Sequence, residues 1–408
     1  MIRRADAVVI GAGAFGASTA YHLAKLGRRV LVVEKRDPVS QTSLLGAAQA
    51  MQIWGNETLS RIAIRSIEMI ESFTKDTGQP LAVHQTGSIR VAQEPEYVEA
   101  LLDEVKRGKS LGIEVDVISP ADAKRRAPFF EPGDTSALWY APRDLYVEPG
   151  QLPRAYLSAA QRLGAVVEAG TTVTAITANG DSVEGVVTDK GDVSTPVVVN
   201  AAGAWARMVG EMAGVFVPVV PTRHQLYITR PISGVDYSQP TVRVLDRRVY
   251  VRPEWGGLLV GHYEPDPWQV DMHTLPADFQ VRDLELNFEP LRRATQDLAR
   301  VFPTLQASDI AEFRGGLPTV TPDGHFILDE APNLRGFFVA TGCNVGGFTT
   351  SPAIGEALAS RIATGQSVLD LTPFSLTRFT GIDSEAKLLE ACHWAYTHKY
   401  STQEVARA

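Results

Sequence analysis

The sequence predicts an α/β protein of two interleaved domains, one built around a parallel sheet and the other an α+β domain on an antiparallel or mixed sheet. Two observations predict the parallel sheet: short apolar runs precede glycine-rich turns at residues 11–16 and 341–347, and a helical pattern follows each turn. A third observation predicts the other sheet, because residues 217–262 contain strand-like runs rich in Tyr, Arg and His. These runs lie between the two turns, so the domains are expected to alternate along the chain.

The first glycine-rich turn has the pattern of a Rossmann-like, nucleotide-binding βαβ unit. An apolar strand, the spacing GxGxxG, a helix and a second buried strand follow one another over residues 7–33. Gly11 permits a tight turn, Gly13 lets a pyrophosphate approach the backbone, and Gly16 lets the helix pack closely on the strand. The turn residues expected to contact a cofactor are Gly11, Ala12, Gly13, Ala14, Phe15 and Gly16.

The second strand ends in an acidic residue that points to the kind of nucleotide. Glu34 lies close to the offset of roughly 20 residues at which a carboxylate accepts hydrogen bonds from a ribose hydroxyl and repels a 2′-phosphate. A GxGxxG spacing alone also occurs in ordinary loops, but its combination with two strands, a capped helix and this acid indicates an ADP-containing cofactor. The position of the unit at the N-terminus, with Lys35 after Glu34, favours FAD over a nicotinamide cofactor.

Composition excludes several classes of protein. With 44% hydrophobic and 21% charged residues, the 408-residue chain is expected to be a soluble globular protein with room for two or three domains. A net charge of −8 argues against a nucleic-acid partner or an anionic membrane surface. Two cysteines are too few for a disulfide framework or a thiolate metal site, so we expect no metal and a reducing, cytoplasmic location. No segment approaches the roughly 20 apolar residues needed to span a bilayer.

Further along the chain, segments of the two expected domains alternate. Residues 37–46 form a polar loop in which Thr42 and Ser43 can bond phosphates. Residues 59–73 follow with the spacing of an amphipathic helix. We then expect a hairpin over 81–93 and a helix over 96–111 in the second domain.

The chain then returns to the nucleotide domain. We expect a helix over 152–163 and strands at 165–168, around Val173 and at 183–188. A buried strand at 197–201 runs into a glycine turn, which suits backbone close to a ligand. The residues of this region expected to contact the cofactor are Val173, Gly203 and Trp205.

Later segments provide the second sheet and another ligand-facing helix. Strands of the second domain lie within 217–229 and 241–262, and a helix is expected over 283–302. A strand at 336–340, the second glycine-rich turn and a helix over 351–362 complete the nucleotide domain, and this helix N-terminus can face the flavin pyrimidine carbonyl. Here the expected cofactor contacts are Leu317, Gly342, Gly346, Gly347, Phe348 and Thr349.

These segments define the expected domains. The FAD-binding domain comprises residues 1–80, 147–212 and 312–380, and the substrate domain comprises 81–146 and 213–311. Residues 381–408 read as a C-terminal helical extension, a candidate contact for an oligomer or a partner subunit.

The chain resembles the FAD-dependent superfamily of D-amino-acid oxidase, glycine oxidase and sarcosine oxidase from its first strand to about residue 380. The most specific stretches are 8–34, 197–205, 315–326 and 346–356. The Thr-x-Thr-Pro-Asp-x-His-Phe run at 319–326 and the segment 374–379 look most like monomeric sarcosine oxidase and N-methyltryptophan oxidase. The resemblance implies FAD, an interleaved two-domain fold, and oxidation of a C–H bond next to an amine nitrogen.

Departures from this family pattern carry further expectations. Gly316 stands where monomeric sarcosine oxidases tether flavin through cysteine, and residues 42–45 lack the histidine that serves a dimethylglycine dehydrogenase-like branch, so non-covalent FAD is expected. Thr349 replaces a lysine that contacts substrate carboxylate, and residues 48–52 lack the family's arginine, so any substrate carboxylate must bind elsewhere. Leu259 replaces the lysine above the flavin that activates oxygen, which removes electrostatic help for superoxide formation, so electrons can pass to oxygen or to another electron acceptor.

By this resemblance, a neutral amine gives hydride from its α-carbon to flavin N5, and the resulting imine is hydrolysed. A desolvated site favours the deprotonated amine, so no catalytic base is strictly required. His262 and Tyr263 can tune the amine proton, while Arg223 with His224, and Tyr250 with Arg252, are candidate carboxylate ligands. The candidate catalytic and substrate residues are His262, Tyr263, Tyr250, Arg252, Arg223 and Thr349.

Other functions share much of this pattern. An FAD-dependent hydroxy-acid dehydrogenase oxidises C–O rather than C–N on the same architecture. The chain can also be the flavin subunit of a multisubunit amine dehydrogenase in which a partner accepts electrons, and a binding protein without redox activity is the remaining alternative. Each arginine above can equally be a solvated or domain-bridging cation.

Overall fold

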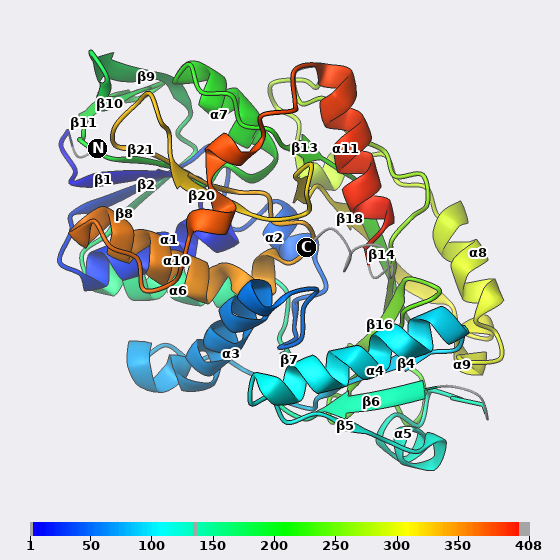
Figure 1. Ribbon diagram of the computed structural model, residues 1–408. Helices are drawn as coiled ribbons and strands as arrows, with labels where there is room; N and C mark the ends of the chain where they lie inside the picture. The colour runs from blue at the N-terminus through cyan, green and yellow to red at the C-terminus, as the bar shows by residue number, and fades with distance from the viewer. Residues whose placement is uncertain (1–2, 134–136, 400–408) are drawn as a thin grey trace.

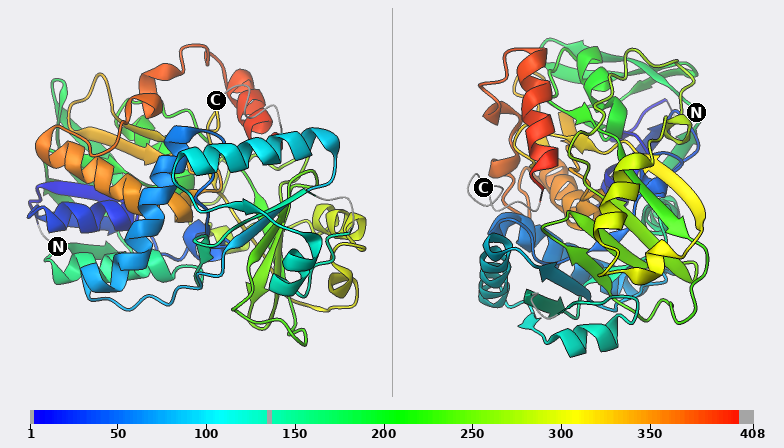
Figure 2. Two further views of the ribbon diagram at one scale, coloured as in Figure 1. Left: turned by 60° about the horizontal axis from the view of Figure 1, so that its bottom comes forward. Right: turned by 90° about the vertical axis from the view of Figure 1, so that its right-hand side faces the viewer.

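The computed structural model describes residues 3–133 and 137–399 and places them around two large sheets (Figure 1). One sheet has six strands and the other eight. In Figure 1 the six-stranded sheet lies at the upper left with the N-terminus, and the eight-stranded sheet lies at the lower right. The left view of Figure 2 shows the same arrangement, with the six-stranded sheet and its helices on the side of the N-terminus and the eight-stranded sheet on the opposite side. No helix of the described residues is long and apolar enough to cross a membrane.

The six-stranded sheet is parallel except at one edge. Its order is β20 (Ile327–Glu330), β21 (Phe337–Thr341), β12 (Val198–Asn200), β1 (Ala7–Ile10), β2 (Val30–Glu34) and β8 (Val166–Ala169). Only β20 runs antiparallel to its neighbour, β21. Strands β1, β12 and β21 are fully buried, which explains why they read as continuous apolar runs. The predicted Rossmann-like sheet is confirmed.

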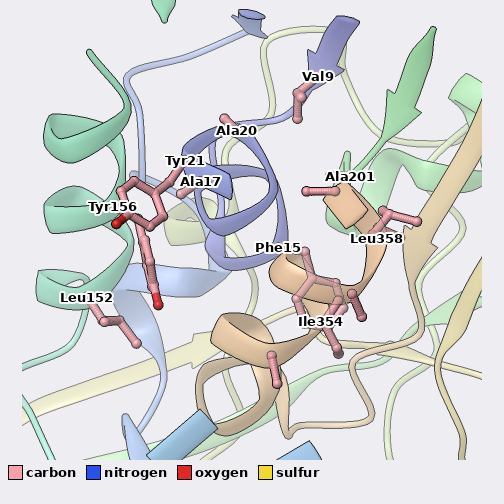
Figure 3. Close-up of a cluster of buried hydrophobic side chains, with 14 of the residues drawn as sticks. Val9, Phe15, Ala17, Ala20, Tyr21, Leu152, Tyr156, Ala201, Ile354 and Leu358 are labelled. Carbon is pink, nitrogen blue, oxygen red and sulfur yellow. The ribbon is translucent and has the colours of Figure 1, made fainter. Parts of the chain in front are cut away.

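Four helices pack around this sheet: α1 (Ala14–Lys25), α3 (Glu57–Thr77), α6 (Gln151–Arg162) and α10 (Gly347–Thr364). Figure 3 shows α1 between α6 and α10, with Phe15 directed toward Ile354 and Tyr21 toward Tyr156. Gly355 lets α10 approach α1 closely, because a Cβ there would lie 2.2 Å from the Ser18 Oγ. Helix α1 is therefore held on both sides.

Two helices start earlier than the sequence pattern predicts. The sequence pattern places the first helix over residues 17–26, whereas α1 begins at Ala14, inside the glycine motif; α10 begins at Gly347, four residues before the expected start. Glycines obscured both starts, because their low helix propensity makes a first turn look like a loop. The first-turn N–H groups of both helices consequently belong to the glycine-rich turns themselves.

The eight-stranded sheet is mixed, as predicted. Its order is β18 (Ile310–Gly316), β14 (His224–Thr229), β17 (Gly257–His262), β16 (Val249–Glu254), β15 (Thr241–Val244), β4 (Ser88–Ala92), β6 (Ala137–Ala141) and β5 (Asp116–Val117). Only the β15–β4 pair is parallel. One face packs on α8 (Glu289–Asp297) and α9 (Pro303–Gln306) through an apolar cluster that includes Val242, Val251 and Leu298.

Two predicted elements of this region were wrong. Residues 81–93 form no hairpin: they contain the single strand β4, whose partners β6 and β15 lie far along the chain. Such pairing is invisible to a local pattern. The helix expected over 283–302 is shorter, with a 3-10 turn at Val281–Asp283 and then α8, because Pro290 favours the first turn of a helix.

The remaining elements are small or peripheral. The small sheets are a three-stranded sheet of β9 (Val173–Asn179), β10 (Ser182–Thr188) and β11 (Gly191–Ser194), and the pairs β3 (Gln49–Ala50) with β7 (Leu145–Tyr146) and β13 (Val220–Pro221) with β19 (Thr319–Val320). The remaining helices are α2 (Thr42–Leu45), α4 (Pro95–Ser110), α5 (Pro120–Arg126), α7 (Ala206–Met212) and α11 (Glu385–Thr397). Further 3-10 turns lie at Gly203–Trp205, Thr372–Phe374 and Leu376–Arg378. Helix α11 contacts β13 and β19, so the C-terminal extension packs on its own chain up to residue 399; residues 400–408 of that extension lie outside the described residues.

Candidate active site

A cavity lies between the carboxyl ends of the parallel strands and one face of the eight-stranded sheet. In open parallel sheets, ligands bind outside the carboxyl ends of the strands, where loops connect the strands to the helices and leave a crevice. Its wall on the six-stranded side includes Gly13, Ala14, Phe15, Ala201, Gly203, Ala340 and Thr341. Thr42, Ser43, Gly316, Leu317 and residues 343–349 continue this wall. The opposite wall includes Arg90, His224, Leu226, Arg243, Tyr250 and Tyr263.

The glycine motif has the geometry that a dinucleotide turn requires. Gly11 has φ +103°, and a Cβ there would lie 2.4 Å from the Ala201 carbonyl oxygen. A Cβ on Gly16 would lie 1.9 Å from the Gly11 oxygen, so both glycines serve close backbone packing. Gly13 lines the cavity, and a Cβ there would approach the Ser43 Oγ at 3.2 Å.

Polar groups are arranged around this turn as a nucleotide would need them. The Glu34 carboxylate accepts hydrogen bonds from the backbone N–H of Ala12 at 2.8 Å and of Arg36 at 2.9 Å. Burial raises the pKa of Glu34. The Ser43 hydroxyl accepts a hydrogen bond from the Ala14 N–H at 3.1 Å, at the start of α1. The Glu34 carboxylate and the Ser43 hydroxyl therefore hold the turn in shape, and the N-terminus of the buried helix α1 beside them favours an anion.

The second glycine-rich turn is held rigidly in front of α10. Asn344 and Val345 have φ of 43° and 67°, which non-glycine residues seldom adopt. The Asn344 side chain holds this conformation by donating to the Gly342 carbonyl at 2.6 Å and accepting from the Thr321 N–H at 3.1 Å. Thr349 donates to the Gln49 carbonyl at 2.7 Å. The helix N-terminus is thus fixed against the cavity.

These residues fit FAD. Gly13 opens the wall beside the α1 N-terminus, where a pyrophosphate needs space and free N–H groups. Glu34 lies at the end of β2, and a ribose hydroxyl can donate to its carboxylate in place of the backbone N–H that donates to it here. The same cavity continues to the N-terminus of α10, whose partial positive charge suits a flavin carbonyl.

The opposite wall is a row of side chains across the eight-stranded sheet. Arg90 of β4 pairs with Arg243 of β15, which pairs with Tyr250 of β16, and Tyr250 pairs with Gly261 of β17. Residues in register share a face, so the row points into the cavity. A Cβ on Gly261 would lie 2.1 Å from the Tyr250 Cζ, so this glycine makes room for the tyrosine ring.

Arg243 and Arg90 differ in their partners within this row. Arg243 donates to the Gln49 side-chain oxygen, and its guanidinium carbon lies 5.1 Å from the centre of the Tyr250 ring. Arg90 forms an ion pair of 2.5 Å with Glu104 and donates to the Ile53 carbonyl at 2.8 Å. Arg243 thus places a guanidinium on the cavity wall, and a guanidinium can bind a substrate carboxylate through two parallel hydrogen bonds.

His224 and Tyr263 extend this wall toward β14. The His224 Nε2 lies 2.9 Å from the Tyr250 hydroxyl oxygen, and its ring centre lies 4.8 Å from that of Tyr263. Burial lowers the pKa of His224 to about 3, so the imidazole is neutral at physiological pH.

Three predicted substrate residues lie outside the cavity lining. Arg223 precedes β14 and faces away from His224, donating to the Glu285 carbonyl at 3.0 Å and pairing with Glu264 at 3.5 Å. Neighbours on an extended strand point to opposite faces, so Arg223 and His224 cannot act together. His262 likewise follows Gly261 on the far face of β17, with its Nδ1 3.3 Å from the Arg248 carbonyl oxygen.

Arg252 shares the face of Tyr250 but is neutralised. It pairs with Glu254 at 2.5 Å, both side chains are fully buried, and its Nε donates to the Ala47 carbonyl at 2.8 Å. It therefore ties the sheet to the loop after α2. Leu259 is fully buried beside this pair, opposite Arg252 in register, and is not among the lining residues.

The predicted cofactor residues divide similarly. Those that line the cavity are Gly13, Ala14, Phe15, Thr42, Ser43, Gly203, Leu317, Gly346, Gly347, Phe348 and Thr349. Gly11 and Gly16 lie behind the turn and permit its close packing, Ala12 donates its N–H to Glu34, and Gly342 packs on Thr321. Lys35 lies 6.0 Å from the centre of the Trp205 ring, and Val173 belongs to an apolar cluster behind the sheet.

The sequence pattern missed Arg243, Arg90, Gln49 and Trp54, all of which line the cavity. Alternation in β15 offered a signal, since Val242 and Val244 are apolar and Arg243 between them must face the other way. Metal binding has no candidate here, because no group of three His, Cys, Asp or Glu in residues 3–133 and 137–399 could hold an ion.

The chain matches several known proteins. A family model described as FAD dependent oxidoreductase matches residues 6–361. Human mitochondrial sarcosine dehydrogenase is 32% identical over 410 residues, which cover 97% of this chain and 44% of that protein. The chain thus spans less than half the length of this relative.

Two solved structures have similar folds. They are L-proline dehydrogenase from P. horikoshii, with a TM-score of 0.82, 26% identity and coverage of 92% of this chain and 97% of that chain, and glycine oxidase from Geobacillus kaustophilus, with a TM-score of 0.80, 25% identity and coverage of 93% and 100%. The resemblance predicted from the motifs is confirmed, and the chain belongs to the FAD dependent oxidoreductase family.

Proposed function

We propose that this protein uses FAD to oxidise a secondary or N-methylated amino acid at the carbon next to nitrogen. The observation that carries the proposal is the position of Arg243 beside Tyr250, on the wall facing the glycine motif and the α10 N-terminus. An arginine and a phenol on one row can hold a carboxylate at a fixed distance from the cofactor. The names of the similar proteins reported above refer to sarcosine, proline and glycine, and all three compounds are amino acids.

When bound, FAD supplies the two-electron acceptor for the C–H bond of the amine. The chain's own residues bind and orient the substrate. Arg243 binds the carboxylate, supported by Gln49, and Tyr250 and Tyr263 exclude water with their rings. Because the wall is largely buried, it disfavours a charged ammonium and so favours the neutral amine that can donate hydride.

We further infer that FAD is held without a covalent bond. Gly316 packs against Thr42, where a Cβ would lie 3.1 Å from the Thr42 methyl group, and has no side chain to attach. Cys343 lines the cavity, but burial raises the pKa of its thiol and keeps it unreactive. Acid precipitation should therefore release all of the flavin into the supernatant.

The electron acceptor is proposed to be something other than oxygen, a redox partner subunit or carrier. By the resemblance, Leu259 stands where related oxidases place lysine; here it is buried outside the cavity lining, and the nearby Arg252 is neutralised by Glu254, so neither residue supplies a cation at this position. A developing superoxide therefore lacks the electrostatic help that such a lysine gives. The two free cysteines, Cys343 and Cys392, are compatible with the reducing compartment proposed for the chain.

Anaerobic bleaching of the yellow holoprotein tests the reaction class. N-methylated amino acids and secondary amino acids should bleach the flavin absorbance, and matched hydroxy acids should not. Slow recovery of the colour in air, with fast recovery on adding a dye acceptor, is expected for a dehydrogenase. Bleaching by hydroxy acids alone would replace the proposal with a hydroxy-acid dehydrogenase, and no bleaching by any substrate would favour a binding protein.

The pH profile should show no titration of His224. Its pKa is lowered to about 3 by burial, so it stays neutral from pH 5 upward and cannot produce a limb near the ordinary value of 6.5. The only expected limb is that of the substrate ammonium, so kcat/KM should rise about tenfold per pH unit until the amine is deprotonated. A second limb near pH 6.5 that disappears in His224→Gln would contradict this assignment.

A further inference from the structure

Helix α11 brings the C-terminal extension into contact with the active site. Figure 1 shows α11, in red, beside β13 and β18 at the upper end of the eight-stranded sheet. Its buried side chains Leu388, Cys392 and Tyr396 join an apolar cluster that contains Tyr250 and Tyr263. Lys399, just after the helix, lines the cavity and lies 5.4 Å from the centre of the Trp54 ring. This helix begins beyond residue 361, where the family match ends.

Three buried side chains form a continuous hydrogen-bonded relay from α11 to the cavity. The Tyr396 hydroxyl oxygen lies 2.7 Å from the His224 Nδ1, and the His224 Nε2 lies 2.9 Å from the Tyr250 hydroxyl oxygen. All three residues are buried, with Tyr396 2% exposed. Of the three, Tyr250 and His224 line the cavity and Tyr396 does not.

The direction of these hydrogen bonds follows from the charge states. Burial keeps His224 neutral, so one ring nitrogen donates and the other accepts. Burial also raises the pKa of Tyr396, which therefore keeps its proton. Among the described residues, the His224 Nδ1 is the acceptor within reach of this buried proton, and an undonated proton would cost an unsatisfied hydrogen bond, so the phenol donates to Nδ1.

We propose that Tyr396 is a positioning residue that fixes His224 in the tautomer whose Nε2–H donates to Tyr250. Tyr250 then directs its own hydroxyl proton to an acceptor other than His224, on the cavity side beside Arg243. In the opposite tautomer Tyr250 would donate to His224 and present only lone pairs to a substrate carboxylate. The carboxylate role rests on the proposed function, whereas the tautomer does not depend on it.

The first test is the protonation of His224 in ¹⁵N-histidine-labelled holoprotein. The wild type should show His224 protonated at Nε2, assigned by loss of the signal in His224→Gln. Tyr396→Phe removes the donor to Nδ1 and should shift the population toward the Nδ1-protonated form. His224 protonated at Nδ1 in the wild type, or an unchanged tautomer in Tyr396→Phe, would overturn the proposal whatever the substrate proves to be.

Kinetics give the second readout. Tyr396→Phe should raise KM for an amino-acid substrate about tenfold, the worth of one hydrogen bond to a charged group, and change kcat by less than about threefold. In a Tyr250→Phe background the same substitution should have no further effect, because the two residues act through one path. An equal rise in KM in both backgrounds would mean that Tyr396 acts only on overall structure.

Tyr227→Phe is the matched control. Tyr227 is equally buried on β14, three residues after His224, but lies on the opposite face among the α8 contacts and outside the cavity. Its KM and the His224 tautomer should match the wild type. If no amine bleaches the wild-type flavin but the tautomer responds to Tyr396→Phe as expected, the relay stands and the amine assignment fails.

Discussion

Replacing Arg243 with methionine is expected to lower kcat/KM for amino-acid substrates by about a hundredfold to a thousandfold. The guanidinium lies on the cavity wall, bonded to the neutral amide of Gln49 and stacked near Tyr250. A buried arginine that binds a carboxylate contributes roughly 2–5 kcal/mol when its partner is truncated. Methionine keeps most of the volume, so the loss should come from charge and hydrogen bonding rather than from a cavity.

The substrate series makes this result specific. The same variant should oxidise an amine lacking the carboxylate at a rate within about threefold of wild type, since that substrate never used the guanidinium. Arg247→Met is the control: Arg247 follows β15 in the same hairpin, is exposed and pairs with Glu94 at 2.7 Å. Equal losses for both substrates in Arg243→Met would show that Arg243 maintains the wall rather than binding substrate.

Much of the cofactor side could be predicted from the sequence because its signals are local. The glycine motif, the two flanking strands and Glu34 lie within residues 7–34, and each has a stereochemical reason to be where it is. The second glycine-rich turn carried a similar signal in residues 341–349. The helix starts were misjudged, because glycine hides a first helical turn, and Val173, expected to contact the cofactor, lies in an apolar cluster behind the sheet.

The substrate side depends on pairings between distant strands, which no local pattern contains. Arg243 faces the cavity beside Arg90 because β15 pairs with β4, although about 150 residues separate them, a separation with no local signature. The predicted pairs of basic and aromatic residues were drawn from sequence neighbours instead. Strand alternation places Arg223 and His224 on opposite faces, and Arg252 is paired with Glu254, which lies two residues away on the same face.

Helix α11 illustrates the same limit. Its pattern predicted a helix, but nothing local indicated that Tyr396 would reach His224, which lies 172 residues earlier. The contact depends on α11 packing across β13 and β19, and those strands are themselves two residues long. Short paired segments carry too little sequence signal to be placed without the tertiary fold.

Gly16→Ala is expected to abolish stoichiometric FAD binding. The added Cβ would lie 1.9 Å from the Gly11 carbonyl oxygen and 3.0 Å from its carbon, so backbone atoms must move. Helix α1 cannot retreat from β1, because α6 and α10 hold it on both sides (Figure 3). The strain should therefore distort the turn at Gly13–Phe15, which lines the cavity.

Two measurements separate the loss of cofactor from the loss of fold. Fluorescence titration should show FAD affinity lowered at least about tenfold. Thermal unfolding of the cofactor-free protein should show a free energy of unfolding lowered by about 3 kcal/mol, the upper range for overpacking. Gly381→Ala is the control, since no heavy atom lies within 4 Å of its added Cβ and its backbone is not left-handed. If Gly16→Ala bound FAD as tightly as this control, the close approach of α1 to β1 would not be what shapes the nucleotide site.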